Sequence, residues 1–182
     1  TAIDVEDILV ENQFRKLQNL LSTITVATED IELEKVVFNL LQQTGKTLSI
    51  AESCTGGLLA SRLTSIRGSS KIFKGGFVPY SIESKVNLLQ IPKTLIEQYN
   101  VISSEVALAM AHSCMQLCNS DFALSITGHL EKQETETIVW IGLSSKEKSV
   151  SKKINLFYDR EKNAVLATNT AFNLLRMFIL QH

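Results

Sequence analysis

One segment constrains the fold more than any other: a short apolar run that passes through a glycine turn into a helix. Residues 47–51 have a buried-strand pattern, the hexapeptide ESCTGG follows at 52–57, and 58–63 is helical in composition. A small hydroxyl at such a junction lies near the positive end of the helix dipole, and glycines let a ligand approach the backbone. The junction therefore predicts either a binding turn for an anion or oxyanion, or a helix cap with two packing glycines.

The sequence after this junction alternates single strands with helices. The patterns follow in the order 76–80 (strand), 84–89, 94–100 and 103–117 (helices) and 122–127 (strand). Residues 137–143 and 150–157 form a hairpin pattern around a polar turn, and a last helix begins after Asp159. This order predicts an α/β fold, at the border of α+β, in which a mixed β-sheet is flanked by helices within a single domain.

The amino-terminal part of the chain is a separate matter. Residues 8–22 have the apolar spacing of a helix, and nothing after about residue 30 has the composition of a linker. We therefore divide the chain into an N-terminal helical appendage or inter-domain linker (1–29) and one domain (30–182). The first residue is Thr1 rather than Met, which leaves room for a longer, two-domain chain.

The overall composition excludes several classes of partner. Lys and Arg number 18 against 19 Asp and Glu, and aromatic residues make up 7%, so we expect no nucleic-acid partner. No apolar run reaches the roughly 20 residues of a membrane span, so we expect no membrane partner. The cysteines are Cys54, Cys114 and Cys118. Without a signal peptide they predict a cytoplasmic protein with no disulfide framework, and no histidine or cysteine pair completes a metal site.

Catalysis by the serine of the turn would need a base. The three histidines fall in no motif, whereas Tyr80 and Lys85 follow the end of a predicted strand. Ligands bind at strand ends in open α/β sheets, which would bring this phenol and this amine near Ser53. A lysine with lowered pKa can act as a base. Taken singly, Lys85 would be an ordinary surface lysine.

At this point the residues resemble a known family. Residues 51–60, AESCTGGLLA, are similar to the signature of the C-terminal domain of the CinA family, the nicotinamide mononucleotide deamidase family. The resemblance covers about residues 30–182, and residues 11–44 resemble the segment that joins the two domains of full-length members. Further matching blocks follow in order: GSS at 68–70, GGFV at 75–78, Tyr80-Ser81, Lys85, SSEVA at 103–107, SITG at 125–128, TIVW at 137–140 and Asp159-Arg160.

The resemblance implies hydrolysis of the carboxamide of nicotinamide mononucleotide, a small-molecule nucleotide, to nicotinate mononucleotide and ammonia. Ser53 matches the nucleophile, Lys85 the general base and Tyr80 a helper in proton transfer or ligand positioning. The resemblance implies no metal and no cofactor, and it is compatible with a homo-oligomer. We assign substrate binding to the turn, to three hydroxyl residues and to one cation: Cys54, Thr55, Gly56, Gly57, Ser69, Ser70, Thr127 and Arg160.

Two alternatives concern the chemistry of this site. Cys54 is a rival nucleophile because it is adjacent to Ser53 and intrinsically reactive. The loop 129–136 departs from the family pattern, because it lacks glycine and proline and carries Glu131, Glu134 and Glu136. Acids repel a phosphate, so we expect weak or no turnover of nicotinamide mononucleotide. The chain could instead be a catalytically degenerate member that binds a nucleotide-like ligand or a protein, or another amide or nucleotide hydrolase on the same scaffold.

Overall fold

The computed structural model describes residues 5–21, 26, 30–131 and 137–181 of the chain. It divides into two compact units, Thr1–Glu32 and Leu33–His182. The first unit contains α1 (Val5–Leu20), which corresponds to the helix predicted at 8–22. The second unit carries the other helices and strands of the described residues, and all of the candidate site lies within it.

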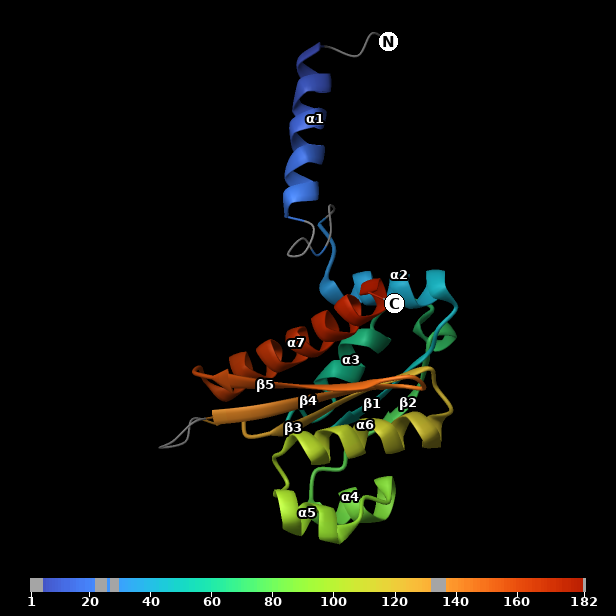
Figure 1. The fold of residues 1–182 in the computed structure, drawn as a ribbon, viewed down its shortest axis with the longest axis vertical. Helices are drawn as coiled ribbons and strands as arrows, with labels where there is room; N and C mark the ends of the chain where they lie inside the picture. Colours follow the sequence, from blue (N-terminus) through green and yellow to red (C-terminus); the bar gives the residue numbers. More distant parts are fainter. Residues whose placement is uncertain (1–4, 22–25, 27–29, 132–136, 182) are drawn as a thin grey trace. The chain divides into compact units, whose positions relative to one another are not determined.

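The second unit is built on a mixed five-stranded sheet, as the sequence predicted (Figure 1). The strands lie in the order β2-β1-β3-β4-β5, in which β1 is parallel to β2 and β3, and β4 is antiparallel to β3 and β5. Their bounds are Leu48–Glu52 for β1, Phe73–Phe77 for β2, Phe122–Gly128 for β3, Thr137–Ser145 for β4 and Ser149–Leu156 for β5.

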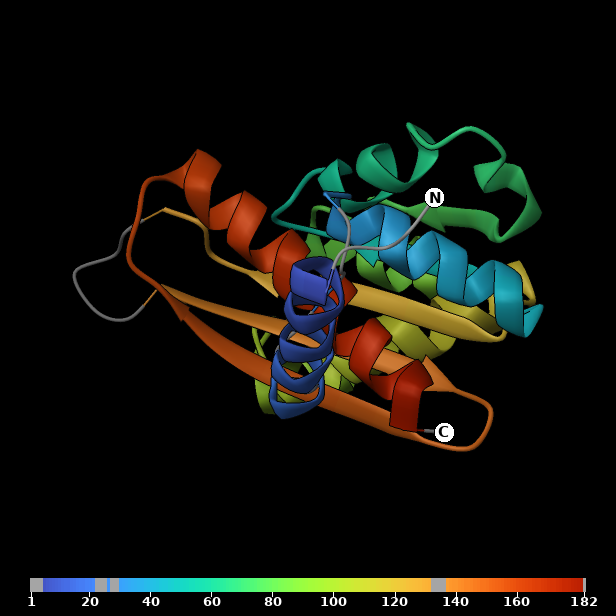
Figure 2. The ribbon, with the colours of Figure 1, turned by 90° about the horizontal axis from the view of Figure 1, so that it is seen from above.

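Helices cover both faces of this sheet. One face carries α2 (Leu33–Thr44), α3 (Leu58–Thr64) and α7 (Arg160–Gln181), and Figure 2 looks onto it with α2 and α7 above the strands. The other face carries α6 (Ser104–Cys118), with α4 (Ile82–Leu89) and α5 (Lys93–Tyr99) beyond it (Figure 1). The predicted fold class is therefore confirmed.

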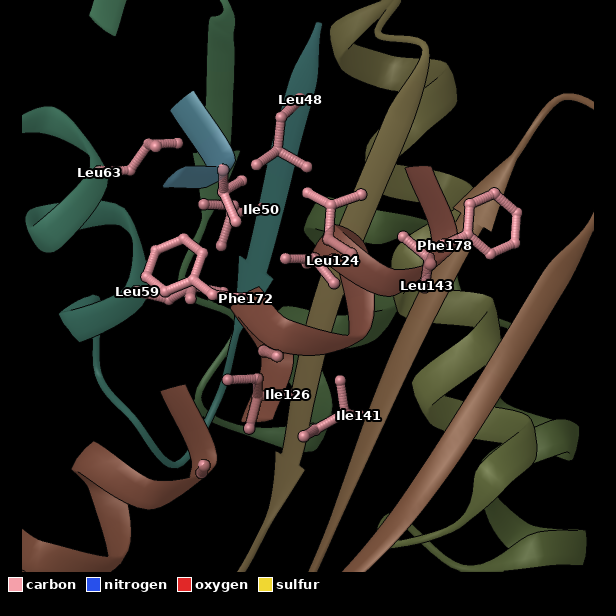
Figure 3. Packing of buried hydrophobic residues seen from close by; sticks show 14 of the residues in the cluster. Leu48, Ile50, Leu59, Leu63, Leu124, Ile126, Ile141, Leu143, Phe172 and Phe178 are labelled. Atoms are coloured by element: carbon pink, nitrogen blue, oxygen red, sulfur yellow. The ribbon is translucent and has the colours of Figure 1, made fainter. Parts of the chain in front are cut away.

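The core follows from the alternation of side chains along the strands. Even-numbered residues of β1 and β3 pack against α3 and α7, whereas Ala51 and Ala123 face α6. Gly142 of β4 lets α6 approach closely, because a Cβ at that position would lie 2.5 Å from the carbonyl oxygen of Ala107. Figure 3 shows the larger cluster with Leu48, Ile50, Leu59, Leu63, Leu124, Ile126, Ile141, Leu143, Phe172 and Phe178.

One strand prediction was displaced along the chain. The sequence placed the second strand at 76–80, but β2 ends at Phe77. Gly76 belongs to the paired part of the strand, because a Cβ there would lie 2.3 Å from the carbonyl oxygen of Ile50 on β1. Pro79 has no amide hydrogen with which to extend the ladder. The predicted hairpin and the start of the last helix are confirmed by β4, β5 and α7.

The strand directions define one functional edge of the sheet. Because β1, β2 and β3 are parallel, they all end at the same edge, which we call the carboxyl edge. The antiparallel pairing of Thr137 with Leu156 brings the end of β5 there too, and α7 begins four residues later at Arg160.

Within the described residues, no helix is both long and apolar enough to cross a membrane.

Candidate active site

The candidate nucleophile Ser53 lies at the carboxyl edge, one residue beyond β1. Its amide donates to the carbonyl of Ile126 at 2.9 Å, so the pairing of β1 with β3 continues through Ser53. Alternation along the strand puts its side chain on the same sheet face as Ala51, the face covered by α6. The Ser53 side chain is thus presented on a fixed backbone and remains 7% exposed.

The structure brings Ser53 and Lys85 together. The Lys85 Nζ donates to the Ser53 Oγ at 3.0 Å and to the carbonyl oxygen of Pro79 at 2.9 Å. Lys85 is 1% exposed, so the alternative of a surface lysine is wrong. Burial lowers the pKa of Lys85 below its ordinary 10.5, because desolvation penalises the charged ammonium. A buried amine of lowered pKa, in hydrogen-bond contact with a serine hydroxyl, is the arrangement that lysine-activated nucleophiles use.

Local sequence explains how Lys85 reaches this position. Ser81 caps α4, and it forms a capping box in which its hydroxyl accepts from the Ser84 amide while the Ser84 hydroxyl accepts from the Ser81 amide. The cap fixes the first turn of the helix, and Lys85 and Leu89, one turn apart, both point inward and are buried. The signal for this placement was present in the sequence as the serine pair before Lys85.

Cys54 has the opposite properties to an activated thiol. The Cys54 side chain is 8% exposed, and burial raises the pKa of its thiol to about 12. Its own backbone amide and the positive charges of Lys85 and Arg160 lower that pKa only in part, and Glu52 adds to the increase. The thiolate is the reactive form of cysteine, so these features favour Ser53 over Cys54 as the nucleophile.

The turn between β1 and α3 is held by Glu52, a residue that the sequence reasoning did not select. Its buried carboxylate accepts hydrogen bonds from the Thr55 hydroxyl at 2.7 Å and from the amides of Leu59 and Ala60 at 2.9 and 2.8 Å. A lone acid at the end of an apolar strand, just before a helix start, was the available signal. Such a carboxylate has to find donors, and the amino end of a helix supplies them.

This contact bears on the two alternatives for the junction, a binding turn for an anion or a helix cap, because Glu52 caps the start of α3. The second and third amides of α3 already bind the carboxylate of Glu52, its first amide donates to the Thr55 carbonyl, and the Gly56 amide donates to the Ser53 carbonyl. The amides of Thr55 and Gly57 have no acceptor among the residues that the structure describes. Gly57 has a φ of 103°, which an L side chain rarely adopts. An oxyanion would thus have to use the turn itself.

Tyr80 and Arg160 lie at the rim. The Tyr80 side chain is 60% exposed, and its hydroxyl accepts from Arg160 Nη2 at 3.1 Å. Arg160 Nη1 donates to Glu131 Oε1 at 3.0 Å. No hydrogen bond between described residues joins the Tyr80 hydroxyl to Lys85 or Ser53, although Tyr80 directly follows the carbonyl that holds Lys85. This places Tyr80 as a rim residue beside the Ser53–Lys85 pair.

Thr127 lies at the site, but its hydroxyl is already bonded to the backbone. The register of β1 and β3 places it beside Ser53 on the same face of the sheet. It is 1% exposed, and its hydroxyl donates to the carbonyl of Val101 at 3.1 Å. Thr127 therefore supports the wall of the site in this conformation.

Ser69 and Ser70 are not brought to the site within one chain. They lie in the short helix η1 (Ser69–Lys71), which precedes β2. Because Leu48 pairs with Phe73 at the start of the parallel strands, η1 lies at the opposite edge of the sheet. The length of β1, roughly 3.3 Å per residue, separates it from the candidate nucleophile. Sequence proximity to β2 alone could not tell which end of the strand these serines would occupy.

Neither a metal cluster within the described residues nor a hollow singles out the Ser53–Lys85 pair: an open hollow of about 620 Å³ at the start of α7 is lined by Tyr158, Asp159 and Lys162 among others, and not by this pair. Among the described residues, no group of three His, Cys, Asp or Glu side chains could hold a metal ion. A hollow of about 230 Å³ lies at the edge opposite the carboxyl edge, with Lys46, Asp121, Phe122 and Phe178 in its lining. Ser53 and Lys85 do not line it, so the chemical argument rests on their contact.

Comparison with known proteins places the second unit in a defined family. The family model described as the CinA C-terminal domain matches residues 30–179, and the chain belongs to the CinA family. A CinA-like protein of Geotalea daltonii is 36% identical over 170 residues, which cover 91% of this chain and 41% of that protein. A CinA-like protein of Dictyoglomus thermophilum is 34% identical over 177 residues, covering 94% and 43%.

Solved structures agree with this assignment. A competence-damaged protein (CinA) superfamily protein from Escherichia coli has a TM-score of 0.73 and 27% identity, covering 86% of this chain and 98% of that chain. The competence/damage inducible protein CihA from Agrobacterium tumefaciens has a TM-score of 0.76 and 26% identity, covering 80% and 92%. The chain spans about two fifths of the length of the curated relatives named above, which carry further sequence.

Proposed function

We propose that the domain is an amidohydrolase that uses Ser53 as its nucleophile and Lys85 as its general base. The single observation that carries this proposal is the 3.0 Å contact between the Lys85 amine and the Ser53 hydroxyl, with both side chains buried. The family resemblance supplies the substrate class, a nicotinamide-type carboxamide of a nucleotide. We further propose that the domain works in the cytoplasm and that residues 1–29 connect it to another domain.

The proposed reaction proceeds through an ester. Neutral Lys85 takes the proton of the Ser53 hydroxyl while the Oγ bonds to the carboxamide carbon. The amides of Thr55 and Gly57 are the candidate donors to the oxyanion. Lys85 then returns the proton to the nitrogen, the carbon–nitrogen bond breaks, and ammonia leaves. Water then attacks the Ser53 ester: Lys85 takes a proton from the water and returns it to the Ser53 Oγ as the ester bond breaks, and the acid product ionises to its carboxylate.

The proposed base predicts a pH profile with a definite sign. Lys85 can accept a proton only when neutral, so kcat/KM should rise with pH through the pKa of Lys85 and then level off. Because burial lowers that pKa, the midpoint should lie below the ordinary 10.5. Initial rates of ammonia release between pH 6 and 10 measure it. Cys54→Ala should keep the same rising limb, and a rate that falls over this range would contradict the assignment.

A direct assay tests the proposed substrate. Purified protein incubated with nicotinamide mononucleotide should release ammonia and nicotinate mononucleotide slowly, because the acidic loop opposes a phosphate. The comparison is a CinA family protein with a glycine-rich loop, and a graft of that loop into 129–136 should raise kcat/KM. Equal efficiency of the two natural proteins would show that the loop has no effect. Residues 132–136 of this loop, including Glu134 and Glu136, lie outside the described residues.

One observation favours a second candidate function. Arg160, the cation that the family resemblance places near the ligand, is already bonded to Glu131. A member whose cation is occupied could bind a nucleotide-like ligand weakly and have lost turnover. Binding of nicotinamide mononucleotide by calorimetry, without ammonia release by any preparation, would support this alternative.

A further inference from the structure

The cations of the helices that begin at the carboxyl edge all have partners in the structure. Lys85 donates to Ser53 and Pro79. In the first turn of α7, Arg160 binds Glu131 at 3.0 Å and Lys162 binds Asp159 at 3.0 Å. An anionic substrate group arriving at the start of α7 would therefore meet two ion pairs rather than two open cations.

Of these two ion-paired cations, Arg160 is the one whose hydrogen bonds connect it to the Ser53–Lys85 pair. It donates to the Tyr80 hydroxyl at 3.1 Å, and Tyr80 directly follows Pro79, whose carbonyl holds the Lys85 amine. The positive charge of Arg160 also lowers the pKa of the Cys54 thiol, so its field reaches the turn beside Ser53. The bonding partner of Arg160 therefore affects whether the site favours or disfavours a negatively charged substrate group.

We propose that Glu131 is a specificity-determining residue that holds Arg160 and selects carboxamide substrates without a phosphate over phosphorylated ones. The proposal rests on the proposed amidohydrolase function. A phosphate monoester carries close to two negative charges at neutral pH. To use Arg160 it must displace a carboxylate already bonded there, and it is repelled by that carboxylate. The substrate class that avoids this cost is a pyridine carboxamide nucleoside, such as nicotinamide riboside.

The exposure of the pair sets the size of the effect. The side chains of Arg160 and Glu131 are 48% and 68% exposed, so water and salt screen them. A buried pair would oppose a phosphate strongly, whereas this exposed one should shift the preference by no more than about fivefold at low ionic strength. The shift should shrink as salt is added, which separates a charge effect from a change in packing.

The test compares two substrates that differ only in the phosphate. We would measure kcat/KM for nicotinamide riboside and for nicotinamide mononucleotide with the unmodified protein, with Glu131→Gln and with Glu161→Gln. The unmodified protein should prefer the riboside, and Glu131→Gln should move the ratio toward the mononucleotide by about fivefold at low salt. Glu161 is exposed in the first turn of α7, next to Arg160, and no hydrogen bond or ion pair between described residues joins the two side chains, so its variant should change the ratio less than about twofold.

A binding measurement separates failure of this proposal from failure of the proposed function. In a Ser53→Ala background, which cannot turn over, Glu131→Gln should tighten binding of nicotinamide mononucleotide and leave binding of the riboside unchanged. An unmodified protein that prefers the mononucleotide, or a ratio and affinities unaffected by Glu131→Gln, would overturn the role of Glu131. If no variant hydrolyses either substrate, the amidohydrolase function fails, and the binding constants still decide whether Glu131 selects against phosphate.

Discussion

Replacement of Ser53 by alanine is expected to lower kcat for carboxamide hydrolysis by at least about a thousandfold, since no covalent intermediate can form. The fold should persist. Ser53 follows β1, its amide keeps its bond to Ile126, and only one hydroxyl is lost. Loss of the single bond from Lys85 should cost about 1 kcal/mol of unfolding free energy. Steady-state ammonia release and a denaturant titration on the same preparation measure both quantities.

The matched control is the neighbouring residue. Cys54→Ala also removes a single heavy atom from a small, buried side chain of the same turn. Because the pKa of the Cys54 thiol is raised to about 12, its thiolate contributes little at neutral pH, and the variant should keep most of the activity. If Cys54→Ala removed the activity and Ser53→Ala did not, the assignment of the nucleophile would be wrong.

The parts of the fold that periodicity encodes were predictable. The strands of the hairpin, the start of α7 and the mixed sheet were expected from alternation and from helix signals, and the structure has them. Ser53 and Lys85 could be expected to meet because each follows the end of a strand in a parallel pair. The capping serines before Lys85 strengthen that inference, since they fix where the helix starts and so which residue points inward.

Two kinds of placement could not be predicted: the edge of the sheet at which a residue lies, and hydrogen bonds between residues distant in sequence. Ser69 and Ser70 precede β2, and only the register with β1 shows that they lie at the far edge. The contact of Arg160 with Tyr80 and Glu131 joins three separate connections at the carboxyl edge, a proximity that no local pattern specifies. Local reasoning evaluates each segment alone, whereas these placements depend on the order of strands in the sheet.

The hydrogen bonds of Glu52 to the turn and to α3 were also not predicted from the sequence. Replacement of Glu52 by alanine should lower the free energy of unfolding of the domain by about 3 kcal/mol or more. The substitution leaves the amides of Leu59 and Ala60 and the Thr55 hydroxyl buried without their acceptor, and each such loss costs about 1–3 kcal/mol before relaxation. For a domain of this size the melting temperature should fall by roughly 6–12 °C. Thermal and urea unfolding, followed by circular dichroism, measure this change.

The control for Glu52→Ala is another acid in the first turn of a helix. Glu105 lies in the first turn of α6 but is exposed, so Glu105→Ala should cost only about 0.3–1 kcal/mol through the helix dipole. Because Glu52 also fixes the turn that carries Ser53, the folded fraction of Glu52→Ala should lose kcat, measured well below its melting temperature. Equal, small losses of stability in the two variants would show that the buried bonds of Glu52 are replaced by water or by relaxation of the turn. In that case the Ser53–Lys85 geometry would have to be maintained by β1 and α4 alone.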